Sequence, residues 1–380
     1  VNNDGQIDLR DSVSDGSPFE DYADNDGNGY EDDILGWDNS GNYGPDDNDP
    51  FPKEGVAPNG TWAHGTHVAG ILAATTDNNL GMASPSYNAK YISVKVSREN
   101  QSGEPGISDG YSGITYAAKA GYYAGSFTII NNSWGGGGYS ASENAVINNA
   151  QDNYGAIILS SAGNGYDSGG EEYSAHYPSS YENCISVCAM GCSGNWGGWA
   201  TYHTTVDLAA PGESIQSAII GAGYEAWDGS SMACPNAASA IGLLSAYHPD
   251  WNNLQLRARI EESADRRVYE QNPDYETCNG NSGNDCFGKG MVDIYKAIGM
   301  DFSPSLTIDS FTVLPANDND SSTLQDNDSV LNPGETAILE VSLNNEAGWV
   351  NASTVIATLS TENPDVMIEN GTEVYGNISA

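Results

Sequence analysis

The chain has 380 residues, with 12 Lys and Arg against 52 Asp and Glu, and its formal net charge is −40. This balance argues against nucleic acids and anionic membranes as partners, because both are bound through clusters of Lys and Arg. No run of 18 apolar residues is present, so the sequence predicts no membrane-spanning helix. The charge suits a secreted, extracellular protein in a calcium-rich or salty medium, although a merely acidic solvated surface explains many of these residues.

Residues 1–54 are dense in Asp, Asn and Gly and form an acidic region with two candidate calcium loops. Both loops place carboxylate or amide oxygens at alternate positions around glycines, a spacing that Ca²⁺ accepts. The first resembles an EF-hand loop whose first aspartate would precede Val1. Solvated acidic loops are the alternative for both. The predicted ligands are Asn2, Asp4, Asp8 and Asp11 in the first loop, and Asp24, Asp26, Asn28, Asp32 and Asp33 in the second.

Residues 55–300 alternate short Val- and Ile-rich runs with segments of helical spacing. Such alternation predicts an α/β domain with a parallel sheet flanked by helices, whose active site lies at the carboxyl ends of the strands. The expected strands are Tyr91–Val96, Phe127–Ile130, Ala156–Ser161 and Cys184–Ala189, and the expected helices are Asp109–Tyr123 and Ser142–Asn153.

Residues 301–380 change in character, because no Lys or Arg follows Lys296. Short alternating runs separated by turn residues predict a smaller C-terminal all-β, sandwich-like module. Its last residues read as the middle of a strand, so we expect the module to be cut short. The predicted strands are Thr307–Val313, Thr336–Leu343, Thr354–Leu359 and Val366–Glu369.

The six cysteines point to an oxidising compartment. Cys278 and Cys286 bracket a Gly- and Asn-rich loop, which predicts a local disulfide. Cys184, Cys188 and Cys192 are crowded, and one pair among them is expected. Cys184 and Cys188 would lie about 13 Å apart on a regular strand, so these two should not pair directly.

Three separated motifs carry groups suited to nucleophilic catalysis. Gly229–Pro235 places Ser231 in a small-residue turn before an alanine-rich helical run, where backbone N–H groups favour developing negative charge. Ala63–Gly70 presents His64, one of five histidines, on a second helical segment. Leu159–Asn164 reads as a buried strand that ends in a turn projecting an asparagine amide.

These motifs, in this order, resemble those of the subtilisin-like serine peptidases (subtilases), and the resemblance extends from about Asp24 to Gly299. Asn131–Gly135, Val206–Gly212 and Gly288–Asp293 are similar to further subtilase segments. The departures are mild: Ser230 stands where threonine is usual, Cys234 where threonine is frequent and Asn236 where histidine is frequent.

The resemblance implies a subtilisin-like fold and a role for each motif. Ser231 would be the nucleophile and His64 its general base, while Asn164 and the backbone N–H of Ser231 would bind the oxyanion. Ser133, Trp134 and Gly135 would pair with substrate backbone, and His176 would lie at the floor of the first specificity pocket. Taken alone, Asn164 reads as a turn residue. His67 reads as a packing residue, and an HxxH metal site lacks a third ligand.

The third member of the triad, an aspartate at the end of an apolar strand, has no counterpart between Val1 and Ala63. We expect it upstream of Val1, in a propeptide or other upstream segment that completes the fold; otherwise the active site is degenerate. Its strand would lie near the middle of the sheet, so a sheet without it should contain a central gap. The sequence therefore predicts a secreted, calcium-stabilised serine endopeptidase acting on polypeptides. A catalytically inactive structural or adhesive extracellular protein is the alternative.

Overall fold

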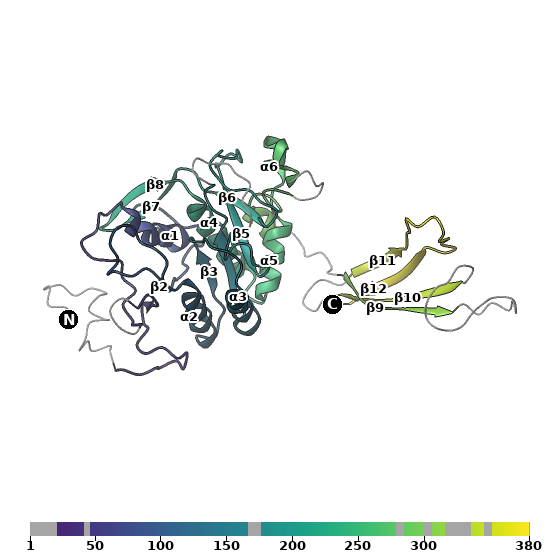
Figure 1. Cartoon of the computed structure of the whole chain (residues 1–380), viewed down its shortest axis with the longest axis horizontal. Coiled ribbons are helices and arrows are strands. Elements are labelled where there is room, and N and C mark those ends of the chain that lie inside the picture. Colours follow the sequence, from purple (N-terminus) through teal and green to yellow (C-terminus); the bar gives the residue numbers. More distant parts are fainter. Residues whose placement is uncertain are drawn as a thin grey trace. The chain divides into compact units, whose positions relative to one another are not determined.

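The computed structural model describes residues 21–41, 46–165, 176–278, 285–299, 306–315, 336–345 and 352–379. The chain divides into two compact units, Val1–Gly299 and Met300–Ala380 (Figure 1). The predicted calcium ligands Asn2, Asp4, Asp8 and Asp11 lie outside the described residues.

A parallel sheet of four strands, in the order β3-β4-β5-β6, forms the centre of the first unit. Every residue of β4 and β5 is buried, which is typical of a parallel sheet covered by helices on both faces. The predicted α/β architecture is confirmed. The strands are β3 (Ile129–Asn132), β4 (Ile157–Ser161), β5 (Cys184–Met190) and β6 (Leu208–Pro211).

Alternate side chains of these strands enter different layers of the core. Leu159 and Val187 pack with helices α4 (Ser230–Tyr247) and α5 (Asn253–Glu262). Ile158 packs instead with α2 (Gly110–Tyr123) and α3 (Ala141–Tyr154), which lie side by side in Figure 1. The short helix α7 (Ile294–Gly299) joins the first layer through Ala297.

Helices α2, α3 and α5 begin at residues whose side chains cap them. Asp109 accepts a hydrogen bond from the N–H of Ser112 at the start of α2, and Ser140 accepts one from Glu143 at the start of α3. Asn252 and Gln255 form a reciprocal capping box at the start of α5. These caps satisfy N–H groups that have no partner within the helix, so local sequence explains the predicted boundaries to within two residues.

A second, two-stranded parallel sheet joins β1 (Gly36–Asp38) to β2 (Ser93–Lys95). Strand β1 is only three residues long, and it ends at an aspartate that sequence analysis did not single out. The Asp38 carboxylate forms a buried ion pair with Lys95 of β2 at 3.0 Å, which joins the two strands through a contact that sequence alone does not reveal.

The two sheets are separated by a break between β2 and β3. Helix α2 packs against β1, β2 and β3, yet no ladder joins β2 to β3 among the described residues. The outer edge of β1 is bridged by Asp47, so in the described part of the chain β2 and β3 present the unpaired edges that face the break. Unpaired parallel edges packed on a common helix are the arrangement expected where a central strand is lacking.

The rest of the first unit surrounds α1 (His64–Ala73) and the sheet. A 3₁₀ turn, η2 (Thr61–Ala63), leads into α1, and the hairpin β7 (Ile215–Ile219) and β8 (Gly223–Trp227) packs on it. Two short segments, α6 (Arg267–Gln271) and η3 (Pro273–Tyr275), lie between α5 and Cys278. Among the helices described, none combines the length and apolar character needed to cross a membrane.

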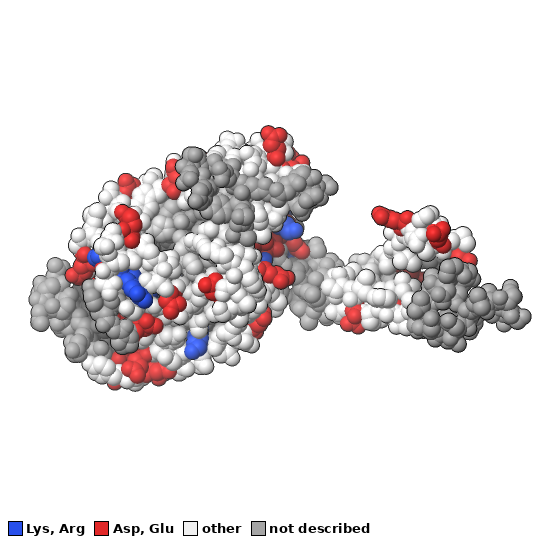
Figure 2. Space-filling view, viewed as in Figure 1, with Lys and Arg blue, Asp and Glu red and all other residues white. Residues whose placement is uncertain are grey.

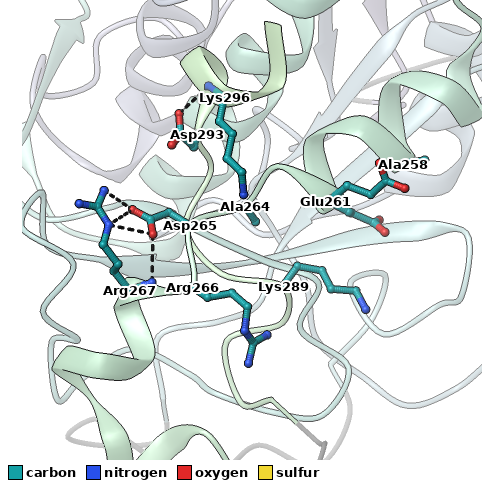
Figure 3. Close-up of a pocket in the computed structure, with 10 residues that line it drawn as sticks. Ala258, Glu261, Ala264, Asp265, Arg266, Arg267, Lys289, Asp293 and Lys296 are labelled. Atoms are coloured by element: carbon teal, nitrogen blue, oxygen red, sulfur yellow. Dashed lines mark hydrogen bonds and ion pairs between the residues drawn. The ribbon is translucent and has the colours of Figure 1, made fainter. Parts of the chain in front are cut away.

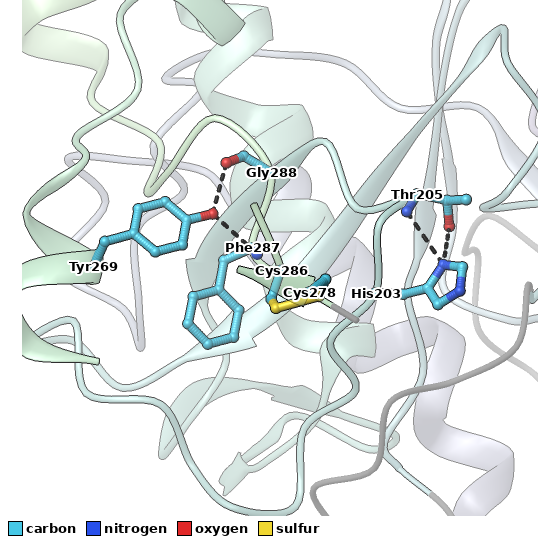
Figure 4. Close-up of a disulfide and its surroundings, with 7 residues drawn as sticks. All are labelled: His203, Thr205, Tyr269, Cys278, Cys286, Phe287 and Gly288. Atoms are coloured by element: carbon cyan, nitrogen blue, oxygen red, sulfur yellow. Dashed lines mark hydrogen bonds between the residues drawn. A yellow bond between two sulfur atoms is a disulfide. The ribbon is translucent and has the colours of Figure 1, made fainter. Parts of the chain in front are cut away.

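The predicted disulfide between Cys278 and Cys286 is confirmed (Figure 4). The pair expected among Cys184, Cys188 and Cys192 is not formed, and that prediction was wrong. Cys184 and Cys188 lie buried on strand β5, whereas Cys192 is exposed beyond its end, so the extended strand keeps the thiols apart.

The second unit contains two antiparallel strand pairs, as the sandwich-like prediction requires. They are β9 (Leu306–Pro315) with β10 (Ala337–Asn345), and β11 (Ala352–Thr358) with β12 (Thr372–Ile378). The hydroxyl of Tyr375 donates to the carbonyl of Val341 at 2.9 Å and links the pairs.

The strand predicted at Val366–Glu369 is wrong. The side chain of Asn363 accepts a hydrogen bond from the N–H of Asp365 at 3.0 Å, and the carbonyl of Asn363 accepts one from Val366. This turn occupies the start of the apolar run, so the strand forms instead at Thr372–Ile378.

Candidate active site

Two helices start at the predicted site and pack against each other. His64 is the first residue of α1, and Ser231 is the second residue of α4, after an N-cap at Gly229. The N–H of Ser231, in the first turn of α4, has no acceptor among the described residues. It is therefore available to stabilise an anion at the helix N-terminus.

Ser231 is joined to the end of strand β3 by two hydrogen bonds. The hydroxyl of Ser133 donates to the carbonyl of Ser231 at 2.8 Å, and the hydroxyl of Ser231 donates to the carbonyl of Ser133 at 3.3 Å. The first bond forms because Pro235, four residues along α4, has no N–H to offer the Ser231 carbonyl. The proline thus frees the group that connects the nucleophile's helix to β3.

Asn164 lies in the turn that follows β4, and its exposed side chain is oriented by Ser230. The Oδ1 atom of Asn164 accepts hydrogen bonds from the N–H and the hydroxyl of Ser230, both at 2.8 Å. With Oδ1 held by the residue before Ser231, the Nδ2 group is left as a donor, and it has no acceptor among the described residues. Sequence reasoning found Asn164 but missed the role of the Ser230 hydroxyl, which was noted only as a departure from threonine.

His64 carries no carboxylate partner within the described part of the chain. Burial lowers the pKa of His64, the nearby His67 lowers it further, and no acidic group raises it. Asp38 does not serve as the orienting carboxylate, because it is buried against Lys95. Among the described residues, His64 and Ser231 form no hydrogen bond with each other. The hydroxyl of Ser231 donates instead to the carbonyl of Ser133.

His67 packs in the core, as predicted when it was weighed against a role as a metal ligand. Its ring is fully buried and stacks on Trp227 of β8, with centroids 4.3 Å apart. Its Nε2 lies 3.0 Å from the carbonyl of Glu225. These contacts fix α1 against the β7–β8 hairpin and thereby hold the helix that begins with His64.

The residues predicted to bind substrate backbone, Ser133–Gly135, follow β3 and pack against His176 and Tyr177. The imidazole of His176 packs so closely on Gly135 that a Cβ on this residue would clash with the Cε1 atom of His176. The N–H of Gly136 donates to the carbonyl of Tyr177 at 2.9 Å, and the hydroxyl of Ser160 bonds the carbonyl of Trp134 at 3.2 Å. Ser133, Trp134, Gly135 and His176 are therefore brought together within the first unit.

The second acidic loop gathers carboxylates around a buried asparagine. Asn28 donates from its amide to Asp26 at 3.1 Å and to Asp33 at 3.0 Å, while Asp24 accepts three backbone N–H groups from residues 27–29. Burial raises the pKa of Asp26, and the charges of Asp33 and Asp24 raise it further. Asp32 instead accepts the N–H groups of residues 21 and 22.

This oxygen-rich donor set fits the chemistry of a hard cation, but the carboxylates are engaged with the backbone or with Asn28. Within the described residues, no three acidic, His or Cys side chains are arranged as a ready metal site.

A cavity of about 750 Å³ lies elsewhere, between the end of α5, the start of α6 and α7 (Figure 3). None of the predicted site residues lines it. Arg267 pairs with Asp265, and Arg266 pairs with Asp285. No Ser, Thr or Cys lines the cavity, so it lacks the nucleophile and base that His64 and Ser231 supply at the starts of α1 and α4.

Comparison with known proteins places these residues in a family. The model of the subtilase family matches residues 19–290. The chain belongs to the subtilase family. Subtilisin amylosacchariticus of Bacillus subtilis subsp. amylosacchariticus is 34% identical over 235 residues, which cover 62% of this chain and 55% of that protein. Thermitase of Thermoactinomyces vulgaris is 34% identical over 254 residues, which cover 66% and 78%.

A solved protease structure from Pseudoalteromonas arctica shares the subtilase fold. It has a TM-score of 0.52 and 24% identity, over 69% of this chain and 82% of that one. This subtilase chain spans about half the length of the first curated subtilisins that it matches. His64, Ser231 and Asn164 lie within the residues that the family model matches.

Proposed function

We propose that this subtilase is a secreted, calcium-stabilised serine endopeptidase. Ser231 attacks the scissile carbonyl, and His64 takes the hydroxyl proton and returns it to the leaving amine. The N–H of Ser231 and the amide of Asn164 stabilise the oxyanion, while Ser133–Gly135 binds the peptide backbone. His176 borders the first specificity pocket.

The observation that carries this proposal is the arrangement around the start of α4. Ser231 presents a hydroxyl and an N–H that has no acceptor among the described residues, and Asn164 turns its amide nitrogen outward because Ser230 holds the oxygen. Two donors beside a nucleophile are what a tetrahedral oxyanion requires. In the resting arrangement the Ser231 hydroxyl bonds Ser133, so a bound substrate must displace that contact.

We propose further that the orienting aspartate belongs to a segment outside residues 1–380. Its strand fits the break between β2 and β3, where two unpaired parallel edges share the cover of α2. Inserting a strand there satisfies the backbone groups of both edges and joins the two sheets. An upstream segment or propeptide is thus the partner that completes the fold.

Active-site labelling tests the function. We expect a fluorophosphonate to label the full-length protein once, at Ser231, as read by peptide mass spectrometry. Ser231→Ala should abolish labelling, while Ser245→Ala, which removes another hydroxyl of α4, should leave it unchanged. Residues 1–380 alone should label far more slowly if the orienting strand is required. A folded full-length protein that stays unlabelled would contradict the proposed serine endopeptidase activity.

One observation favours the second candidate, an inactive structural or adhesive extracellular protein. His64 has no carboxylate among the described residues to hold its ring and stabilise its charged form. The sequence upstream of Val1 discriminates between the two. An apolar strand ending in Asp-[Ser/Thr]-Gly favours the peptidase, and a full-length protein without one favours the scaffold.

Calcium is proposed to stabilise the second acidic loop. Asp24, Asp26, Asn28, Asp32 and Asp33 would supply the oxygens, and the cation would offset the burial and the charges of Asp33 and Asp24 that raise the pKa of Asp26. We expect chelation to lower the Tm of the full-length protein by roughly 5–10 °C and added Ca²⁺ to restore it, because the cation binds only the folded loop.

Matched variants distinguish a specific calcium site from general screening of the acidic surface by cations. Asp26→Asn should blunt the calcium response, whereas Asp250→Asn, which removes one exposed charge outside the loop, should not. The scans are compared at equal ionic strength with Na⁺ in place of Ca²⁺. Equal protection by both cations would contradict the site and leave only a screened acidic surface.

A further inference from the structure

Behind the Asn164 turn lies a buried threonine that bonds both neighbours of the asparagine. Thr201, in the loop between β5 and β6, is 1% exposed. Its N–H donates to the carbonyl of Gly163 at 3.3 Å, and its Oγ1 accepts the N–H of Gly165 at 2.8 Å. One residue, distant in sequence, therefore closes the turn from both sides.

The turn needs such a support because of its composition. Gly163 and Gly165 have φ of +111° and +71°, and glycine leaves many backbone conformations open. A Cβ on Gly163 would lie 3.0 Å from the Thr201 Oγ1, so glycine also permits the close approach. Among the described residues, the other side-chain support of this turn backbone comes from Ser230, whose hydroxyl accepts the N–H of Gly163 at 3.2 Å.

The position of this backbone decides where the amide of Asn164 points. Ser230 fixes the Oδ1 atom, and the backbone of Gly163–Gly165 fixes the Cα from which the side chain extends. A donor stabilises a transition state only if it is held in place before the charge develops. A shift of about 1 Å in such a group can reduce a rate about 100-fold.

We propose that Thr201 is a positioning residue for the oxyanion-binding amide of Asn164. The inference rests on the proposed function and adds a residue that touches neither substrate nor nucleophile. Its hydroxyl oxygen acts through Gly165, and its N–H acts through Gly163. The effect of losing the hydroxyl therefore falls on the transition state, not on ground-state binding of the peptide.

The test is steady-state kinetics of the full-length protein on a peptide substrate. Thr201→Val keeps the shape but removes the acceptor, and it should lower kcat about 10- to 100-fold with KM changed less than about twofold. Thr201→Ser keeps the oxygen but loses a methyl group, and it should restore most of kcat. Thr204→Val, at an exposed neighbouring hydroxyl, should resemble the wild type.

A double-mutant cycle separates positioning from packing. In an Asn164→Ala background, Thr201→Val should reduce kcat by less than about twofold, because the group that it positions is gone. If Thr201→Val does not fold, Thr201→Ala replaces it in the same cycle, and Ser231 labelling normalises the rates to folded enzyme.

Three results would overturn the role: a wild-type kcat in Thr201→Val, an undiminished effect in the Asn164→Ala background, or a Thr201→Ser variant as slow as the valine. Failure of the proposed function looks different. It appears as a wild-type protein without Ser231-dependent hydrolysis, before any Thr201 variant is compared, and it removes the role together with the function.

Discussion

Replacing His64 with alanine is expected to lower the kcat of the full-length protein about a millionfold, the size of loss that removal of this base causes in subtilisin. The serine hydroxyl is a weak nucleophile until an imidazole accepts its proton. His64 starts the helix that packs on the helix of Ser231, and burial lowers its pKa so that the neutral, proton-accepting form prevails at neutral pH.

The measurement is the initial rate on a chromogenic peptide with excess substrate. His64→Ala and Ser231→Ala combined should be no slower than either alone, because the two groups act as one unit. His248→Ala, at the opposite end of α4, is the matched histidine control and should retain wild-type kcat. A His64→Ala enzyme with more than about 1% of wild-type kcat would remove His64 from the role of general base.

Replacing Asn164 with alanine is expected to lower kcat about 100- to 1000-fold, the loss found in subtilisin on removal of an oxyanion donor, with little change in KM. The amide meets the oxyanion only after the carbonyl carbon becomes tetrahedral, so ground-state binding does not depend on it. Because Ser230 holds the amide oxygen, the amide nitrogen is the donor that Asn164 offers, and alanine has no donor to replace it.

A peptide boronate, which becomes tetrahedral on Ser231, should lose affinity in Asn164→Ala in proportion to the loss of kcat. Asn153→Ala, an asparagine near the end of α3, should change neither quantity. Reduced kcat with unchanged boronate affinity would contradict oxyanion binding and return Asn164 to the role of a turn residue.

Much of the fold followed from local pattern. The buried apolar runs of β4 and β5 and the capped helices α2 and α3 were expected because alternation, helical spacing and capping residues are properties of short segments. The prediction of a strand at Val366–Glu369 was wrong, and the cause is also local. The Asx turn at Asn363 takes up the start of the apolar run. The cysteine pair expected near Cys192 failed because residues close in sequence are held apart on an extended strand.

The sequence by itself determined the chemistry available: Ser231 at a helix start, His64 on a helix and Asn164 in a Gly-Asn-Gly turn, each specified by its immediate neighbours. The tertiary structure alone decided how they are held. Ser133 meets Ser231 across 98 residues, and Thr201 reaches Gly165 across 36. The missing aspartate strand predicted a central gap in the sheet, but the tertiary structure decided that β2 and β3 border it, because strand pairing depends on which segments pack beside one another.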